Sequence, residues 1–155
     1  ITLQDLGIYD MLAEHNTCHW HWPKSGKAMP EVVKAAADAN IYLTSVNALS
    51  ENGEMVNIDG TGNRVAAIVY GPKEVLVIAG MNKVCDTLED AITRARTVAA
   101  PMNQQRFGLP NPCTCTGVCA DCLSETSICN QILITRNCKS AGRIKFVLVG
   151  EELGF

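Results

Sequence analysis

The sequence contains few aromatic residues and no long hydrophobic run. Phe, Trp and Tyr make up 5% of the 155 residues, so aliphatic side chains must supply most of the core. The longest apolar run, at residues 75–79, has the length of a single strand and is too short to cross a bilayer. We therefore expect no membrane span.

Clustered positive charge is also lacking. The 13 Lys and Arg residues are scattered singly among 16 Asp and Glu residues, which gives a formal net charge of −3. A broad nucleic-acid-binding face needs grouped basic side chains, so this function is disfavoured. No basic stretch followed by an apolar stretch is visible at the N-terminus, so there is no sign of a secretory signal, and we expect a cytoplasmic protein.

Cysteine, by contrast, is abundant. Five of the eight cysteines fall between residues 113 and 129, in the segment PCTCTGVCADCLSETSIC. Thiolates so close together repel one another and oxidise readily unless a metal ion, an iron–sulfur cluster or disulfide pairing stabilises them. Disulfide-dense domains are typically short and poor in core residues. Because 47% of this chain is hydrophobic, we expect reduced thiols.

The hydrophobic pattern and the turn signals predict one domain over residues 1–155, with no internal repeat and no linker. Thr2 is expected to cap the first helix. Asp86 and Glu89 resemble a capping box, and the helix that they begin should keep Val98 on its apolar face and end at Pro101. Helices are expected at 2–14, 30–39, 65–70 and 86–98, strands at 41–46, 54–58, 74–79, 131–135 and 143–149, and a cysteine-rich loop at about 110–130.

Strands that alternate with helices predict an α/β fold with a mostly parallel sheet and helices on both faces. In such sheets, ligands bind beyond the carboxyl ends of the strands. Polar side chains stand where several expected strands end, and we expect them to converge on one crevice: Asn47, Asn57, Asp59, Asn82 and Lys83.

A glycine-rich loop, DGTGNR at residues 59–64, opens a short helix and is a candidate anion site. Its glycines let backbone amides approach a ligand, the helix N-terminus attracts negative charge, and Arg64 can bind a carboxylate or phosphate through two hydrogen bonds. The same residues also fit a plain strand-to-helix turn with Arg64 in solvent. The candidate substrate-binding residues are Asn47, Asn57, Asp59, Gly60, Thr61, Gly62, Asn63, Arg64 and Lys83.

Lys83 and Asn47 each have more than one interpretation. Lys83 fits a second cation for the same anion, a base whose pKa is shifted by burial, or an ordinary surface lysine. Asn47 fits either a ligand-orienting residue or the cap of a turn. The sequence contains no recognisable acid–base pair or nucleophilic triad, so no catalytic residue is assigned.

A second group of metal-ligand residue types lies in a polar loop: His15, Cys18, His19 and His21. In an extended loop, alternate side chains share one face, which would suit a metal ion. We prefer a loop without metal, at the rim of a site or facing a partner. The isolated Cys18, Cys85 and Cys138 are expected to be small core or surface residues.

Four blocks of sequence resemble the LUD (lactate utilisation) domain family, in its cysteine-containing branch. They are, in order, ANIYLTSVNALSENGEMVNIDGTGNRVAAIVYGPKEVLVIAGMNKV, ITRARTVAAPMN, PCTCTGVCADCLSETSICN and VLVGEELGF. The resemblance implies the fold of the sugar-phosphate isomerase and CoA-transferase superfamily. It also implies that an N-terminal βα segment is missing before Ile1, as in a truncated chain.

The cysteine pattern of this resemblance is P-C-x5-C-x2-C-x6-C, which matches Cys113, Cys119, Cys122 and Cys129 and leaves Cys115 as an extra cysteine. Four thiolates can hold Zn²⁺ in a closed site or an iron–sulfur cluster. The spacing fits neither a zinc ribbon nor the bacterial ferredoxin run, so the metal stays open. Thiols that only hold the loop in place are the alternative.

The resemblance implies a component of lactate or other hydroxy-acid utilisation. A small anionic metabolite would bind at the glycine-rich loop, and a cysteine-bound cluster would pass electrons to redox partner subunits; as an enzyme, the chain would be an oxidoreductase component. A non-catalytic metabolite-binding or sensing domain with a structural cysteine loop is the alternative. A third possibility is an interaction subunit whose cysteine and tryptophan loops dock a redox partner.

Overall fold

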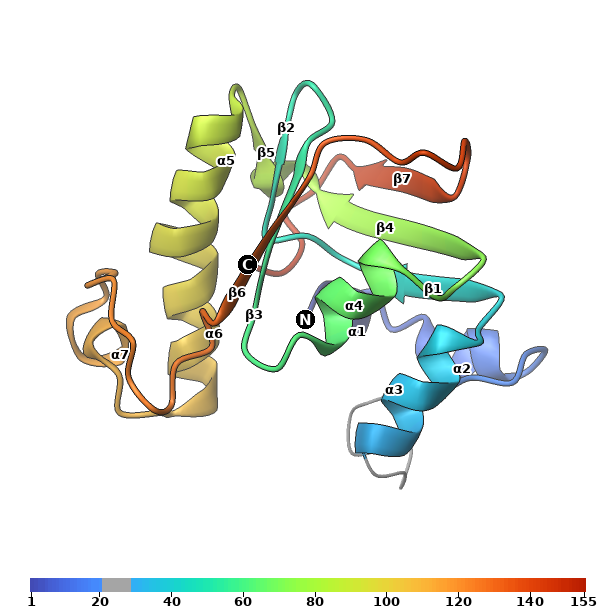
Figure 1. Ribbon diagram of the computed structural model, residues 1–155, viewed down its shortest axis with the longest axis horizontal. Coiled ribbons are helices and arrows are strands. Elements are labelled where there is room, and N and C mark those ends of the chain that lie inside the picture. Colours follow the sequence, from blue (N-terminus) through green and yellow to red (C-terminus); the bar gives the residue numbers. More distant parts are fainter. Residues whose placement is uncertain (21–28) are drawn as a thin grey trace.

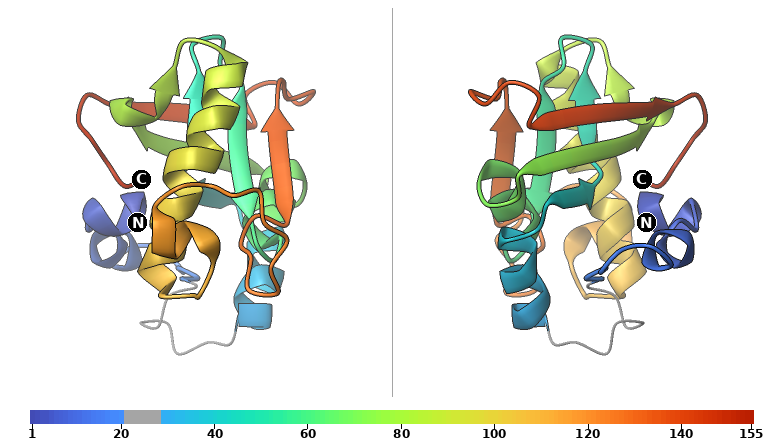
Figure 2. Two further views of the ribbon diagram at one scale, coloured as in Figure 1. Left: turned by 90° about the vertical axis from the view of Figure 1, so that its left-hand side faces the viewer. Right: turned by 90° about the vertical axis from the view of Figure 1, so that its right-hand side faces the viewer.

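Two β-sheets form the centre of the structure, and their strands run across one another (Figures 1 and 2). The computed structural model describes residues 1–20 and 29–155. One sheet is parallel, with the order β1-β4-β7: β1 (Ile41–Thr44), β4 (Glu74–Gly80) and β7 (Ile144–Val149). The other has the order β5-β2-β3-β6: β5 (Val84–Cys85), β2 (Ala48–Ser50), β3 (Met55–Asp59) and β6 (Gln131–Thr135).

The predicted α/β fold is confirmed, but the second sheet is mixed. Its β2–β3 and β3–β6 pairs are antiparallel, and only β2–β5 is parallel. The strand expected at 41–46 is shorter than predicted because the chain leaves the parallel sheet after Thr44 and enters the mixed sheet at Ala48. Residues 45–47 make this crossing, and they become important for the site.

A long helix covers the mixed sheet on one side of the molecule, and shorter helices lie on the other side (Figure 1). The long helix consists of α5 (Leu88–Arg94), a π-helical segment η3 (Ala95–Ala99) and α6 (Ala100–Phe107). The remaining helical elements are α1 (Thr2–Asp5), α2 (Tyr9–Ala13), α3 (Met29–Ala37), α4 (Asn63–Val69), the 3₁₀ turn η2 (Met81–Lys83) and α7 (Pro112–Thr116).

The core has two parts. One lies where the two sheets cross and contains Val46, Leu49, Met55, Ile68, Val75, Val77 and Ala79. The other lies between the mixed sheet and the long helix, where Ala91, Ala95 and Ala100 allow the helix to approach β2 and β3 closely. Every residue of β3 is buried because the strand is covered on both faces.

Three helix predictions were wrong in detail. The helix expected at 2–14 is divided into α1 and α2 at Gly7, which has a φ of +62°. Thr2 does not cap α1 with its side chain, which is used in a tertiary contact. Thr87, rather than Asp86, caps α5 by accepting from the Asp90 amide at 3.1 Å.

Pro101 does not end the long helix. It lies in the first turn of α6, directly after the π-helical segment. Proline has no backbone N–H, and the altered hydrogen bonding of the π-helical segment needs no donor at this position. The π-helical segment also shifts the inward face by one residue. Ala99 is therefore buried, whereas Val98, which we expected on the apolar face, is 40% exposed.

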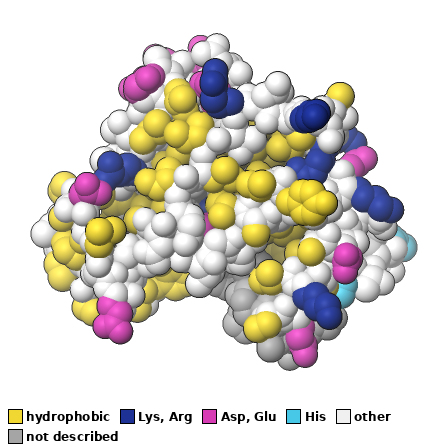
Figure 3. Space-filling view, in the orientation of Figure 1, with side chains coloured by type: hydrophobic (Ala, Val, Ile, Leu, Met, Phe, Trp, Pro, Cys, Tyr) yellow, Lys and Arg dark blue, Asp and Glu magenta, His cyan; other side chains and the backbone are white. Residues whose placement is uncertain are grey.

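Hydrophobic side chains are spread across the middle of the face shown in Figure 3, with charged side chains mainly around its rim. Exposed large apolar residues of β6 and β7 include Ile132, Ile134, Phe146, Val147 and Leu148. In the described ranges, no helix has the length and apolar character that a membrane crossing requires.

Candidate functional site

The carboxyl ends of the three parallel strands meet at one edge of their sheet, where a ligand site is expected. Ser45 follows β1, Lys83 closes the turn that follows β4, and the C-terminal segment 150–155 follows β7. The three strands point in the same direction, so these segments lie together. This edge therefore collects polar groups from parts of the chain that are far apart in the sequence.

Lys83 lies at the centre of this edge. Its side chain is only 3% exposed, and its Nζ donates to Thr2 Oγ1 over 2.9 Å and to Ser45 Oγ over 3.2 Å. Ser45 Oγ in turn donates to Thr2 Oγ1 over 3.2 Å. No carboxylate within residues 1–20 and 29–155 forms an ion pair with this amine.

Burial and neighbouring positive charge lower the pKa of Lys83 to about 8. The loss of water around the ammonium group is the largest cause, followed by repulsion from Arg94 and then Arg64, while Asp5 acts in the opposite direction. A buried cation that lacks a charged partner is costly. The cluster is therefore short of negative charge.

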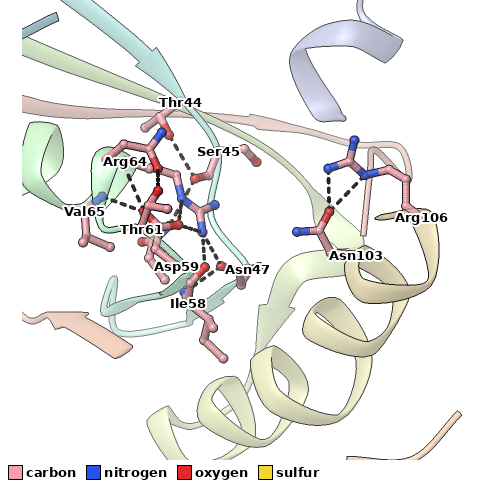
Figure 4. A network of polar contacts seen from close by, with 12 residues as sticks. Thr44, Ser45, Asn47, Ile58, Asp59, Thr61, Arg64, Val65, Asn103 and Arg106 are labelled. Atoms are coloured by element: carbon pink, nitrogen blue, oxygen red, sulfur yellow. Dashed lines mark hydrogen bonds and ion pairs between the residues drawn. The ribbon is translucent and has the colours of Figure 1, made fainter. Parts of the chain in front are cut away.

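Arg64 and Asp59 form an ion pair beside this cluster (Figure 4). Arg64 Nε donates to Asp59 Oδ1 over 2.9 Å. Asp59 Oδ2 accepts from the backbone N–H groups of Arg64 and Val65, each over 3.0 Å. The chain's own carboxylate thus occupies the N-terminus of α4, where we expected the amides to receive a ligand anion.

Asn47 connects Arg64 with Arg94. Its Oδ1 accepts from Arg64 Nη2 and from the Ile58 amide, each over 2.9 Å. Its backbone carbonyl accepts from Arg94 Nη1 over 2.6 Å, and Arg94 Nε donates to the carbonyl of Asn82 over 2.8 Å. Both partners of Arg94 are uncharged, so the positive charge of this guanidinium is not neutralised by them.

The structure therefore brings four of the predicted residues together: Asn47, Asp59, Arg64 and Lys83. Asn57 supports them from β3, where it is fully buried and its Nδ2 donates to the Ser45 carbonyl over 3.2 Å. Its Oδ1 has no partner in the described part of the chain.

The other residues of the glycine-rich loop have different positions. Thr61 and Asn63 bond to each other at the surface over 2.9 Å. Gly62 forms the N-cap of α4 with a φ of +81°, a conformation that favours glycine. Gly60 lies against the cysteine loop, since a Cβ there would be 3.3 Å from Ile128 Cα.

The C-terminal segment closes one side of the Lys83 cluster. The Leu153 amide donates to Asn82 Oδ1 over 3.2 Å, and Thr2 Oγ1 donates to the Leu153 carbonyl over 3.4 Å. Gly154 has a φ of +62°, and a Cβ there would lie 2.6 Å from Thr2 Oγ1 and 3.3 Å from Lys83 Nζ. Only glycine fits this position without a shift of the segment.

A second candidate site lies between α6 and the cysteine loop, in the lower left of Figure 1. A cavity of about 60 Å³ is lined there by Cys113, Cys119, Cys122 and Cys129, together with residues such as Gln104. Burial raises the pKa of Cys129, and negative charge on the other three thiols raises it further, so the four sulfur atoms are close enough to interact. Cys115 is exposed and does not line the cavity.

The four thiols surround the cavity without forming a closed ligand set. As arranged in the described ranges, no group of three or more His, Cys, Asp or Glu side chains can hold a metal ion. The structure joins none of the eight cysteines in a disulfide. In the second histidine group, His15 and His19 are exposed, and His21 lies outside the described residues.

Two buried amides hold the cysteine loop in place. Asn111 is 1% exposed, donates to the Thr126 carbonyl over 3.1 Å and accepts from the Ser124 hydroxyl. Gln104 donates to the same carbonyl over 3.2 Å, while its Oε1 has no partner among the described residues. The end of the cysteine loop is hydrogen-bonded to the glycine-rich loop: the backbone N–H of Asn130 donates to the backbone carbonyl of Asp59 over 3.1 Å.

The sequence model of the LUD domain matches residues 1–149. The chain belongs to the LUD domain family. The family resemblance is therefore confirmed over residues 1–149, which include the first three sequence blocks, and it relates this LUD domain to lactate utilisation. Neither the curated proteins nor the solved structures contain a match to the chain.

Sequence reasoning missed three residues around Lys83 of this LUD domain. Ser45 was counted as part of a strand, although it lies directly at the strand's carboxyl end, which was the available signal. Thr2 was interpreted only as a helix cap. Arg94 lies on the side of α5 that reaches Asn47 and Asn82, and no local pattern distinguishes it from a surface residue.

Proposed function

We propose that this LUD domain binds a small organic anion at Lys83, as a component of lactate or other hydroxy-acid utilisation. The observation that carries the proposal is the buried Lys83 amine, whose close partners are the hydroxyl groups of Thr2 and Ser45. A carboxylate at this amine would supply the negative charge that the cluster lacks. We place the anion here rather than at α4, whose N-terminal amides are bonded to Asp59.

The surrounding groups suit a hydroxy acid. The hydroxyls of Thr2 and Ser45 can donate to and accept from a ligand hydroxyl. Arg64 and Arg94 lie close enough to Lys83 to add to the positive potential around its amine. This potential favours an anionic ligand over a neutral analogue. The C-terminal segment limits the space beside Nζ, so a ligand with few heavy atoms is expected.

Calorimetric titration with lactate tests this function. Lactate should bind the wild-type chain, and Lys83→Met should weaken binding at least about tenfold because a charge-assisted hydrogen bond is lost. Lactamide, which has no carboxylate, should not bind. Lys73→Met removes an exposed lysine and is the matched control. Equal lactate affinity in the Lys83→Met protein would disprove the assignment.

We also propose that Cys113, Cys119, Cys122 and Cys129 form a metal centre, either Zn²⁺ or an iron–sulfur cluster. The donor chemistry fits, because four thiols from one loop line a single cavity. Bound metal would draw the thiolates into a closed set and compensate their mutual repulsion. An iron–sulfur cluster there would supply electron transfer, whereas zinc would stabilise the loop.

Metal analysis and absorption spectra of anaerobically purified protein test the cysteine centre. Cys129→Ser should lose the bound metal, whereas Cys115→Ser should retain it because Cys115 does not line the cavity. Colourless, metal-free wild-type protein with freely titratable thiols would show that the loop holds no metal.

A further inference from the structure

Lys83 has the surroundings of a nucleophilic amine as well as those of an anion-binding group. Its side chain is removed from water, it forms no ion pair with the described carboxylates, and two guanidinium groups lie close enough to repel it. A desolvated lysine beside other cations is the arrangement that favours the neutral, reactive amine. An ordinary structural lysine would be paired or exposed.

The geometry points to Lys83 as the residue that forms a Schiff base with a 2-oxo acid, through its Nζ and with the hydroxyl groups of Ser45 and Thr2 as proton carriers. This inference rests on the proposed anion site. It adds a covalent step and a substrate class: the oxidation of a 2-hydroxy acid yields a 2-oxo acid, so both compounds belong to the same utilisation system.

The chemistry balances without a further reactant. The neutral Nζ adds to the carbonyl carbon of the 2-oxo acid and forms a C–N bond, while the C=O π bond breaks and the oxygen takes up a proton that Nζ releases. In the resulting carbinolamine the C–O bond breaks, and the hydroxyl leaves as water with the second proton from Nζ, which leaves a C=N bond between Lys83 and the acid. The hydroxyls of Ser45 and Thr2, at 3.2 Å and 2.9 Å from Nζ, can pass the protons that these steps require.

The surroundings also fit the carboxylate of such a substrate. Once Nζ is used in the covalent bond, Arg94 provides positive charge near the site, whereas Arg64 is already paired with Asp59. Among the described residues, Arg94 donates to the backbone carbonyls of Asn47 and Asn82 and forms no ion pair, so a carboxylate would be its first charged partner there. The acid is then held by charge on one side and by the imine on the other.

The lowered pKa of Lys83 also supports a nucleophilic role for its amine. With a pKa of about 8, roughly a tenth of the Lys83 amine is neutral at pH 7, compared with fewer than about one in a thousand for an ordinary lysine. At equal access, Lys83 should therefore form the pyruvate adduct roughly two- to three-hundredfold more readily than an exposed lysine.

Reduction with borohydride tests the inference directly. The full chain is incubated with pyruvate at pH 7, borohydride is added to convert the imine to a stable secondary amine, and the modified peptide is located by mass spectrometry. We expect one adduct, on Lys83. Lys83→Arg keeps the positive charge but cannot form the imine, and Lys73→Arg, which changes an exposed lysine, should label as the wild type does.

The outcomes separate this inference from the proposed function. Pyruvate that binds in calorimetry but leaves no adduct on Lys83 would overturn the Schiff base and leave the anion site intact. Adducts distributed evenly over the lysines would also overturn it. Absence of both lactate and pyruvate binding would remove the anion site, and the inference with it. Peptide mapping of the wild type gives the answer even if Lys83→Arg does not fold.

Discussion

The amine of Lys83 lies 2.9 Å from the hydroxyl of Thr2, a residue 81 positions earlier in the chain. The contact joins the turn after β4 to the first helix, and the C-terminal segment covers both. The cluster therefore exists only when both ends of the domain are folded against the parallel sheet. Its charge, packing and chemistry can be tested separately.

Stability should depend on pH through Lys83. Its pKa is about 8 in the folded chain, below the ordinary value of 10.5. Between these values the unfolded chain binds the proton more tightly, so the contribution of Lys83 to stability rises from about pH 8 to about pH 10.5 and is constant below. Lys83→Met should raise the free energy of unfolding at pH 7 by about 1–3 kcal/mol, because the lost hydrogen bonds to Thr2 and Ser45 offset part of the gain.

Urea denaturation of the two proteins at pH 7 and at pH 9.5 measures this effect. Arg94, Arg64 and Asp5 face Lys83 and are present in both proteins. The Ile1 amino group is also present in both, and burial and neighbouring positive charge, including that of Lys83, lower its pKa. The difference between the proteins should therefore shrink as the pH rises. A substitution that destabilises the chain equally at both pH values would contradict the prediction.

Loss of the Asp59 carboxylate should be costly. Asp59→Ala removes the carboxylate that accepts from the Arg64 and Val65 amides in the first turn of α4, and it leaves Arg64 without its charged partner in a mostly buried position. We expect a loss of roughly 3 kcal/mol in the free energy of unfolding. Glu74→Ala breaks the exposed ion pair with Lys145 and should cost less than about 1 kcal/mol. Equal losses for the two variants would mean that burial of the Asp59–Arg64 pair does not increase its contribution to stability.

The positions of five strands could be predicted because their apolar runs are strong, as in the strand that became β4 and the strand that became β6. The short strands β2 (Ala48–Ser50) and β5 (Val84–Cys85) were missed because two or three residues form no recognisable apolar run. The division into two sheets could not be predicted, because nothing in the apolar pattern of 41–50 marks the point where the chain changes sheets. The π-helical segment was also missed. Its sequence, ARTVA, is an ordinary helical stretch, and the bulge is visible only in the hydrogen bonds and in the burial of Ala99.

The strand-end argument predicted that Asn47, Asp59 and Lys83 would lie close together, and Arg64 was expected beside them because it belongs to the same glycine-rich loop as Asp59. It could not predict that the Asp59 carboxylate would occupy the amides of α4, because both partners belong to the loop that was expected to hold the ligand. Nor could it identify Thr2 as a partner of Lys83. That contact depends on how α1 packs against the sheet, which the periodicity of residues 2–14 does not encode.

Asn111 should control the order of the cysteine loop. Asn111→Ala removes hydrogen bonds to Ser124 and Thr126 in a position that is 1% exposed. We expect a loss of roughly 2–3 kcal/mol and faster amide hydrogen exchange in the loop, because buried partners lose their bonds. Asn103→Ala changes a half-buried residue of α6 whose side chain accepts hydrogen bonds from Arg106, and it should leave exchange in the loop unchanged. Unaltered exchange in the Asn111→Ala protein would mean that other contacts order the loop.

Gly154→Ala should expose Lys83. A Cβ at this position would lie 2.6 Å from Thr2 Oγ1, so the C-terminal segment must move away from the cluster that it covers. The variant should react faster than the wild type with an amine-acylating reagent at Lys83, measured by mass spectrometry of the labelled peptide.

Gly142→Ala provides the matched control. Gly142 also has a positive φ, of +74°, but a Cβ there would meet nothing within 4 Å, so only the conformational cost is added. Because both variants carry that cost, faster labelling of Lys83 in the Gly154→Ala protein alone would arise from displacement of the segment. Identical Lys83 labelling in the wild type and both variants would show that residues 150–155 do not limit access to the amine, and the route of a ligand to Lys83 would then have to lie elsewhere.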